Sequence, residues 1–462
     1  MQHMHLPVAI IGAGPVGLAA AAHLVAGGDT PVIFEAGDRI ASAMHAWSHI
    51  QVFSPWKYNI DPVAQALLSE HGDWVAPDGE AYPTGGEIIA QYLTPLASLP
   101  AIAPHIHLNA RVLSVTRQGY DKMKTAGRDE MPFALQVEHA DGSEAVILAR
   151  AVIDASGTWS SPNPLGTNGV PAPGERRLQD RISYGMPDVR ATARARFANK
   201  RILVVGSGHS AFNALNDLVA LKQEEPQTEI FWAIRRAAPG QMFGGSENDQ
   251  LEARGELGRS VEQLVANDTI HTVMGFRTSR LGFSDDGVIV SSDEQSLPPV
   301  DEIIATTGFR PNLEMLRELR LDIDPVVESP TTLAPMIDPN IHSCGTVRPH
   351  GAVELQHPER DFYIAGMKSY GRAPTFLMIT GYEQVRSIVA ALRGDWDAAR
   401  RVELTLPETG VCTLGNASGA GGCCTTATSG TALEIANTVS CCGSPQLVTL
   451  GAGAPAASRC CG

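Results

Sequence analysis

Short apolar runs alternate with helical patterns along most of this chain. Residues 6–40 predict a strand, a helix and a second strand, because an unbroken apolar run before a glycine-rich turn is typical of a buried parallel strand. Helical patterns follow at residues 62–71 and 86–99. The same order returns from residue 199, with a strand, a glycine-rich turn, a helix to Ala220 and a strand at residues 229–234.

Between these two units, apolar and polar positions alternate, which predicts an antiparallel meander. Its strands are expected near residues 108–116, 133–138 and 145–153. A proline- and glycine-rich stretch at residues 161–174 then predicts a crossing between domains. Late in the chain, residues 361–366 predict a strand and residues 376–392 a long helix, both in the style of the first unit.

The second unit is therefore predicted to be inserted into the first. The expected first domain is discontinuous and the second domain, with its leading linker, interrupts it; a tail rich in Gly, Ala, Ser and Thr follows. The predicted limits are 1–165 with 301–406, then 166–300, then 407–462.

Two glycine fingerprints lie at the turns that open the two units. The first is GAGPVG, with Gly12, Gly14 and Gly17, and the second is GSGHSA, with Gly206, Gly208, Ser210 and Ala211. Each follows a predicted strand and opens a helix, the context in which the first glycine allows a tight turn and the second lets a pyrophosphate approach. The sequence thus predicts an α/β fold with two Rossmann-like dinucleotide-binding domains.

The first fingerprint is predicted to hold the ADP half of FAD. Glu35 ends the second strand, where an acidic side chain would bind the ribose hydroxyls. FAD domains usually carry the N-terminal copy and are completed by a distant C-terminal segment. Gly366 and Met367, before the 376–392 helix, fit that completing role. A site for NAD alone is the alternative.

The second fingerprint is predicted to hold NADPH, with NADH as the alternative. Arg235 and Arg236 directly follow the next strand, and guanidinium groups pair bidentately with a 2′-phosphate. A solvated pair of arginines at a strand end is the other interpretation.

The net charge of −15 disfavours nucleic acid and anionic membranes as partners. No apolar run approaches the length of a membrane span, and the first predicted strand begins within ten residues of Met1. We therefore expect a cytoplasmic protein. A small-molecule or metalloid substrate and a possible homodimer are separate expectations.

The layout of residues 6–400 resembles the flavin-containing monooxygenases. ATTGFRPN at residues 305–312 is similar to the segment that joins their NADPH domain back to the FAD domain, and DASGT at 154–158 is similar to its first counterpart. SPWKYN at 54–59 is similar to the segment they place beside the flavin ring. The resemblance implies a flavin contact at Trp56 and catalytic roles for Ser54 and Asn59; a loop asparagine is the alternative for Asn59. The histidine of the FxGxxxH signature is missing near residues 182–188, which favours a divergent branch.

Residues 53–56, 121–125, 349–351 and 366–376 also resemble the flavoproteins of bacterial arsenic-resistance operons. That resemblance implies monooxygenation of an arsenical and places Lys368 and Phe376 near the flavin, with Lys368 as a catalytic candidate.

Seven of the eight cysteines lie in the tail: Cys412, Cys423, Cys424, Cys441, Cys442, Cys460 and Cys461. Adjacent Cα atoms are about 3.8 Å apart, less than the usual span of a disulfide, so neighbouring cysteines pair poorly with each other. Two thiolates can nevertheless bind one soft ion. The tail is predicted to capture a soft metalloid; disulfides between pairs, zinc and a tail of no consequence are the alternatives.

The leading hypothesis is an FAD- and NADPH-dependent monooxygenase that uses O₂ on a soft nucleophile such as a trivalent arsenical. No CxxC pair precedes Cys412 to accept electrons from the flavin. One rival is a metal or disulfide reductase with shuttle cysteines in the tail, and another is a non-catalytic metalloid chaperone or sensor.

Overall fold

The computed structural model describes residues 5–71, 73–237, 252–341, 347–374 and 376–404. Its two parallel sheets lie in one compact unit, Met1–Gly415. All eight cysteines lie outside the described residues, so the structure does not test the metal-binding prediction for the tail.

The first sheet holds five parallel strands in the order β15-β7-β1-β2-β3. Its strands are β1 (Val8–Ile11), β2 (Pro31–Phe34), β3 (Ile106–His107), β7 (Ala151–Asp154) and β15 (Phe362–Ile364). Successive residues point to opposite faces of a strand, so the sheet feeds two separate cores: Ile10 and Ile153 enter one, and Ile11 and Val152 the other. Burial on both faces explains why these strands are unbroken apolar runs.

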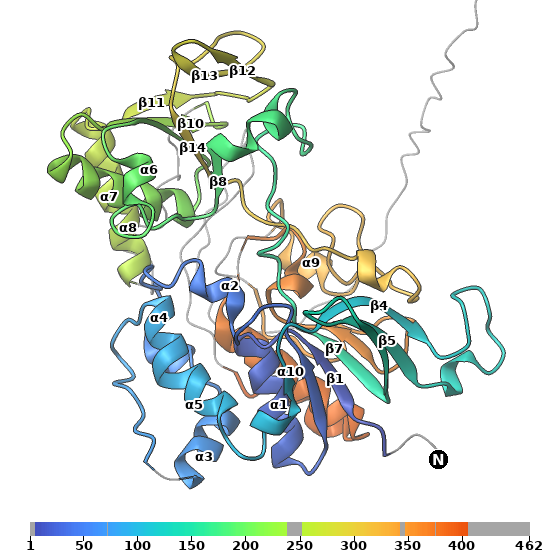
Figure 1. Cartoon of the computed structure of the whole chain (residues 1–462). Coiled ribbons are helices and arrows are strands. Elements are labelled where there is room, and N and C mark those ends of the chain that lie inside the picture. The colour runs from blue at the N-terminus through green and yellow to red at the C-terminus, as the bar shows by residue number, and fades with distance from the viewer. Residues whose placement is uncertain (1–4, 72, 238–251, 342–346, 375, 405–462) are drawn as a thin grey trace, which may run out of the picture. The chain divides into compact units, whose positions relative to one another are not determined.

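The second sheet is also parallel, in the order β11-β10-β9-β14-β8. Its strands are β8 (Ile182–Tyr184), β9 (Arg201–Val205), β10 (Glu229–Ile234), β11 (His271–Met274) and β14 (Glu302–Ala305). They all come from chain between β7 and β15 of the first sheet (Figure 1). The predicted class is thereby confirmed: a mixed α/β fold in which one parallel-sheet unit is inserted into another. The exact domain limits stay predictions.

Helices pack against both sheets (Figure 1). α1 and α10 lie side by side against the first sheet, where Val16 of α1 touches Gly381 of α10. The longer helices are α1 (Pro15–Ala26), α3 (Pro62–Glu70), α7 (His209–Glu224), α8 (Glu252–Ala266) and α10 (Met378–Leu392). The short ones are α2 (Ser42–His45), α4 (Gly85–Ile88), α5 (Thr94–Ala97), α6 (Arg194–Phe197), α9 (Ala334–Ile337) and α11 (Trp396–Arg400).

The predicted meander is present with one correction. β4 (Arg111–Arg117), β5 (Phe133–Glu138) and β6 (Glu144–Ala149) form an antiparallel sheet, while β12 (Arg280–Ser284) and β13 (Gly287–Ser291) form a separate hairpin. The segment predicted as one strand at 145–153 is two strands, because the chain leaves the meander after β6 and joins the first sheet as β7.

The helix predicted at residues 86–99 is present as residues 85–97, but it is not a regular α-helix throughout. α4 and α5 are separated by one π-helical turn, Ile89–Leu93. Pro95 has no N–H to donate to the carbonyl of Gln91, and that carbonyl instead accepts from the Trp74 indole at 2.7 Å.

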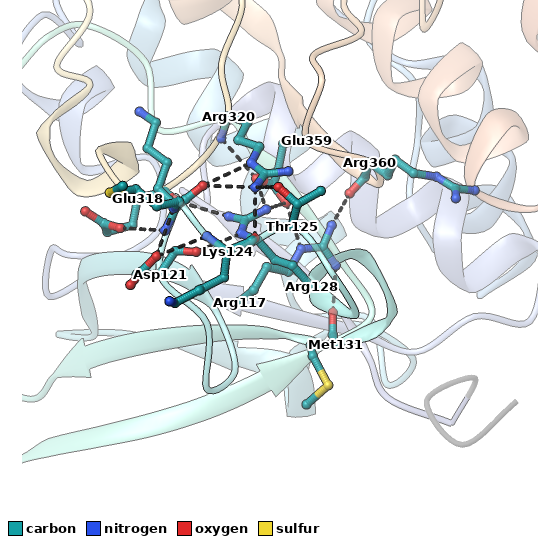
Figure 2. Close-up of polar contacts among 12 residues, drawn as sticks. Arg117, Asp121, Lys124, Thr125, Arg128, Met131, Glu318, Arg320, Glu359 and Arg360 are labelled. Atoms are coloured by element: carbon teal, nitrogen blue, oxygen red, sulfur yellow. Dashed lines mark hydrogen bonds and ion pairs between the residues drawn. The ribbon is translucent and has the colours of Figure 1, made fainter.

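A buried charge cluster joins the meander to the amino end of β15 (Figure 2). The guanidinium groups of Arg117 and Arg128 both donate to the Glu359 carboxylate at 2.8 Å, and the Arg320 N–H donates to it at 3.0 Å. All three charged side chains are almost fully buried. These bonds hold the pKa of Glu359 below its usual range against the opposing effect of burial.

Candidate functional site

The first fingerprint has a backbone that only glycine tolerates at two of its three positions. Gly12 has φ +102°, and a Cβ placed on it would lie 2.7 Å from the carbonyl oxygen of Ala155. A Cβ on Gly17 would overlap the carbonyl oxygen of Gly12. Gly14, by contrast, is extended, caps α1 and has nothing within 4 Å of its missing Cβ. The open space therefore lies at the amino end of α1, where backbone amides and the helix dipole favour an anion.

The second fingerprint repeats this arrangement on β9 and α7. Gly206 has φ +133°, and its missing Cβ would overlap Thr306 at the end of β14. Gly208 is extended, caps α7 and is open within 4 Å, like Gly14. Ala211 is fully buried and Ser210 half-buried in the first turn of α7. The two turns are thus alike, and each central glycine leaves open the space that a side chain would fill; we call these two turns, at the amino ends of α1 and α7, the cradles.

The residues predicted to bind the two ribose ends follow β2 and β10. The Glu35 carboxylate accepts the N–H of Ala13 at 3.0 Å and that of Gly37 at 2.9 Å, so it ties the end of β2 to the first fingerprint. Arg235 is exposed and Arg236 half-buried directly after β10. Glu35, Arg235 and Arg236 thus lie at the strand ends where the sequence predicts them, while their contacts to ribose and phosphate stay predictions.

The C-terminal segment predicted to complete the first site lies against the start of α1. A Cβ on Gly366 would lie 3.2 Å from Val16, and the N–H of Gly366 donates to the Gln384 amide at 2.7 Å. Phe376 packs edge-on against Tyr370, with ring centroids 5.2 Å apart, and Met367 is half-buried. The fold therefore brings residues 366–374 and Phe376 to the first fingerprint from a distance of about 350 positions in the chain.

Lys368, a catalytic candidate from the sequence, is held in a buried ion pair. Its amine lies 2.6 Å from the Asp154 carboxylate and donates to the Ser156 hydroxyl at 3.1 Å. The other oxygen of Asp154 accepts the N–H and hydroxyl of Ser156. The pair thus fixes the turn that places Ala155 against Gly12. This geometry favours a positioning role for Lys368 over proton transfer.

Ser54 and Asn59, the other catalytic candidates, form a closed turn. The Asn59 amide donates to the carbonyls of Ser54 and Pro55 at 2.8 and 2.9 Å, and accepts from the Ser54 hydroxyl at 3.0 Å. Both amide hydrogens of Asn59, which is fully buried, are therefore used within the turn. Trp56 is buried in the same turn. The structure assigns Asn59 the holding of this turn, and its role beside a flavin stays a prediction.

Sequence reasoning missed the buried polar residues that support these segments. The Tyr382 hydroxyl donates to the Asn59 carbonyl at 2.9 Å, and the Gln384 amide donates to His350 and to the Ser369 hydroxyl, each at 2.9 Å. Burial lowers the pKa of His350. A signal existed for Gln384, because it is a polar residue surrounded by apolar ones in the predicted 376–392 helix.

Residues 9–344 match the pyridine nucleotide-disulphide oxidoreductase family, and the chain belongs to this family. Among curated proteins it is 22% identical over 258 residues to ferredoxin–NADP reductase 2 of Exiguobacterium sibiricum, covering 54% of this chain and 63% of that protein. It is 28% identical over 212 residues to the indole-3-pyruvate monooxygenase YUCCA1 of Oryza sativa subsp. japonica, covering 45% and 44%. The chain thus spans less than two thirds of either relative.

The fold is similar to that of the bacillithiol disulfide reductase Bdr (YpdA) from Bacillus cereus, with a TM-score of 0.62 at 19% identity over 86% of this chain and 99% of that one. At this identity the likeness shows the fold alone. The family match confirms the predicted class at the level of pyridine nucleotide oxidoreductases, and the cofactors and reaction of this protein stay predictions. No helix in the described part of the chain is long and apolar enough to cross a membrane.

Proposed function

We propose that this protein is an FAD- and NADPH-dependent monooxygenase that oxygenates a soft nucleophile, with a trivalent arsenical as the leading candidate. The observation that carries the proposal is the pair of cradles at Gly14 and Gly208, each at the amino end of a helix. Reduction of a flavin by a nicotinamide requires one protein to hold both dinucleotides.

The first cradle suits FAD because it is enclosed by segments from three parts of the chain. Val16 of α1 packs against Gly366, the Lys368–Asp154 pair fixes the adjoining turn, and Gln384 holds the Gly366 N–H. A cofactor that stays bound through many turnovers needs such an enclosure. The turn at residues 54–59 would exclude water from the flavin and fix its surroundings through Trp56 and Asn59.

The second cradle suits NADPH because Arg235 is exposed beside it at the end of β10. A guanidinium here would pair with the 2′-phosphate that distinguishes NADPH from NADH. Arg235→Ala should therefore weaken NADPH binding by about tenfold, as expected for one lost charged contact, and leave NADH binding unchanged. Equal losses for both nucleotides would contradict the assignment.

The electron balance of the proposed reaction involves O₂. NADPH and the substrate each supply two electrons, and NADPH with one proton from solvent supplies the two hydrogens of water. One oxygen atom of O₂ enters the substrate and the other leaves in that water. When bound, FAD supplies the chemistry that passes these electrons to O₂. The arsenical as substrate is supported by the resemblance of residues 366–376 and by the paired tail cysteines, whose thiolates would bind a soft ion and deliver it.

We also propose the domain limits stated above, a cytoplasmic location and a homodimer.

The decisive assay is substrate-dependent NADPH oxidation by the full chain, with and without O₂. The substrates would be arsenite, methylarsenite, mercuric ion and a simple sulfide. The proposal predicts rapid oxidation with a trivalent arsenical in air and an oxygenated product. Product formed from NADPH without O₂ would contradict it.

The rival function is a metal or disulfide reductase, which the family and the cysteine pairs Cys423–Cys424, Cys441–Cys442 and Cys460–Cys461 favour. It predicts anaerobic turnover that disappears when residues 411–462 are deleted. A chaperone or sensor predicts metalloid binding with no NADPH consumption. Turnover that survives the deletion would exclude both an essential tail and the chaperone.

A further inference from the structure

One ring contact joins the turn at residues 54–59 to the second fingerprint. Phe53 comes directly before that turn, and His209 is the first residue of α7, directly after Gly208. The ring centroids of Phe53 and His209 are 5.3 Å apart, with an interplanar angle of 44°. Residues that are predicted to flank different cofactors are therefore in direct contact.

The contact continues into the second sheet through two more rings. His209 packs edge-on against Phe212 and Phe212 edge-on against Trp232, both with centroids 6.1 Å apart. The Trp232 indole donates to the carbonyl of Gly206 at 2.7 Å. A series of packed rings thus runs from the turn at 54–59 to the glycine that fixes the second fingerprint.

A second observation concerns Asp217, further along α7. Asp217 is eight residues after His209, which places both on one side of the helix. Burial raises the pKa of Asp217, Asp188 acts in the same direction, and His49 and Arg190 oppose it. His49 is four positions before Phe53, and its Nε2 atom is buried without a hydrogen-bond partner among the described residues. His49 is thus close enough to α7 to act on the pKa of Asp217.

We infer that Phe53 and His209 are positioning residues for the transfer of electrons between the two cofactors. Their contact fixes the amino end of α7, which would hold the nicotinamide dinucleotide, relative to the turn that would flank the flavin. This inference rests on the proposed function, because it assumes that NADPH reduces the flavin. Hydride transfer is sensitive to such placement, since a misplacement of about 1 Å can cost a hundredfold in rate.

The test measures the rate at which NADPH reduces the flavin in the absence of O₂, in a rapid-mixing experiment. Phe53→Leu and His209→Leu remove one ring each and keep an apolar side chain. We expect the rate at saturating NADPH to fall by about tenfold or more in each, while FAD content and affinity for NADP⁺ stay within about twofold. Phe53→Tyr keeps the ring and should restore the rate.

The double variant Phe53→Leu/His209→Leu should be no slower than either single variant, because one contact is lost only once. His271→Leu is the matched control, since His271 makes a similar ring contact with Phe231 at 5.1 Å between β11 and β10. It should leave the reduction rate unchanged. Rate losses that add in the double variant, or an equal loss in His271→Leu, would overturn the inference.

A second measurement does not depend on activity. Amide hydrogen exchange of residues 47–59 in the protein as purified should become faster in His209→Leu and stay unchanged in His271→Leu. Equal reduction rates in all variants, a loss of NADP⁺ affinity in place of rate, or unchanged exchange would each overturn the inference. If the wild type is not reduced by NADPH at all, the proposed function fails; the exchange measurement then still decides whether the contact couples the two segments.

Discussion

The two fingerprints have similar backbone conformations but differ in how the rest of the chain supports them. In both, the first glycine is packed against backbone and the central glycine is open. The first fingerprint is braced by the turn at residues 154–156 and by residues 366–384, which come from far along the chain. The second is braced at Gly206 by Thr306, which directly follows β14, and by the Trp232 indole of β10, both from its own sheet, while Phe53 contacts it at His209.

The third residue of each fingerprint, Gly17 or Ala211, also differs between the two sites. Gly17 cannot carry a Cβ without overlapping Gly12, whereas the equivalent position in the second fingerprint is a buried alanine, Ala211. The first helix therefore packs more tightly on its turn. We interpret the braced site as that of a resident cofactor and the less braced site as that of a cofactor that exchanges in every turnover.

The largest expected effect is that of breaking the ion pair beside the first site. Lys368→Met leaves Asp154 charged and buried, which costs about 3–5 kcal/mol of folding free energy. The variant should unfold at lower denaturant concentration and lose FAD. Asp154→Asn added to Lys368→Met should recover part of the stability.

Glu359→Gln is the matched control for that prediction. Glu359 is also buried and ion-paired. However, Glu359 precedes β15 and Lys368 follows β15, so the two ion pairs lie toward opposite ends of the sheet. The control should lose similar stability while the folded protein keeps its FAD affinity. If both variants lose FAD equally, the Lys368 pair has no special link to the cofactor site.

The third positions give the next smaller effect. Gly17→Ala forces the turn and α1 apart and should cost about 1–3 kcal/mol with loss of FAD. The opposite change in the second fingerprint, Ala211→Gly, should cost only about 1 kcal/mol of helix stability. Denaturant unfolding and flavin absorbance would measure both, and similar effects at the two positions would remove the distinction drawn here.

The smallest expected effect is a dependence of FAD retention on pH. Neutral His350 accepts a hydrogen bond from Gln384, which also holds Gly366. Burial lowers the pKa of His350, and the hydrogen bond to the Arg348 carbonyl and the nearby carboxylates of Glu354 and Glu383 oppose this only in part. The folded protein thus resists the proton that the unfolded chain accepts, so the stabilisation is complete above about pH 6.5 and is lost as the pH falls.

FAD release should therefore become easier below that pH, and less so in His350→Gln, which cannot take up the proton. His357, whose pKa burial lowers to about 4, adds its own acid sensitivity to both proteins. Only the difference between wild type and variant reports on His350. Identical pH profiles would contradict its role.

Local patterns made much of this architecture predictable. The fingerprints, the strands before them and the insertion of one unit into the other follow from apolar runs and glycine spacing, which act over a few neighbouring residues. The pairing of Lys368 with Asp154 could not be predicted, because it joins residues 214 positions apart. The same holds for the contact of Phe53 with His209. Asn59 was expected beside a flavin, but the closed turn that it forms depends on backbone geometry that the sequence does not specify.

The central claim is that the first cradle holds FAD and the second holds NADPH. Gly14→Val and Gly208→Val test it most directly, because both glycines are extended with open space, so a side chain fills the cradle and leaves the fold intact. Bound flavin and its anaerobic reduction by NADPH would be measured in both variants. We predict that Gly14→Val is purified without FAD, and that Gly208→Val keeps FAD but is not reduced. FAD lost from Gly208→Val and kept by Gly14→Val would contradict the account.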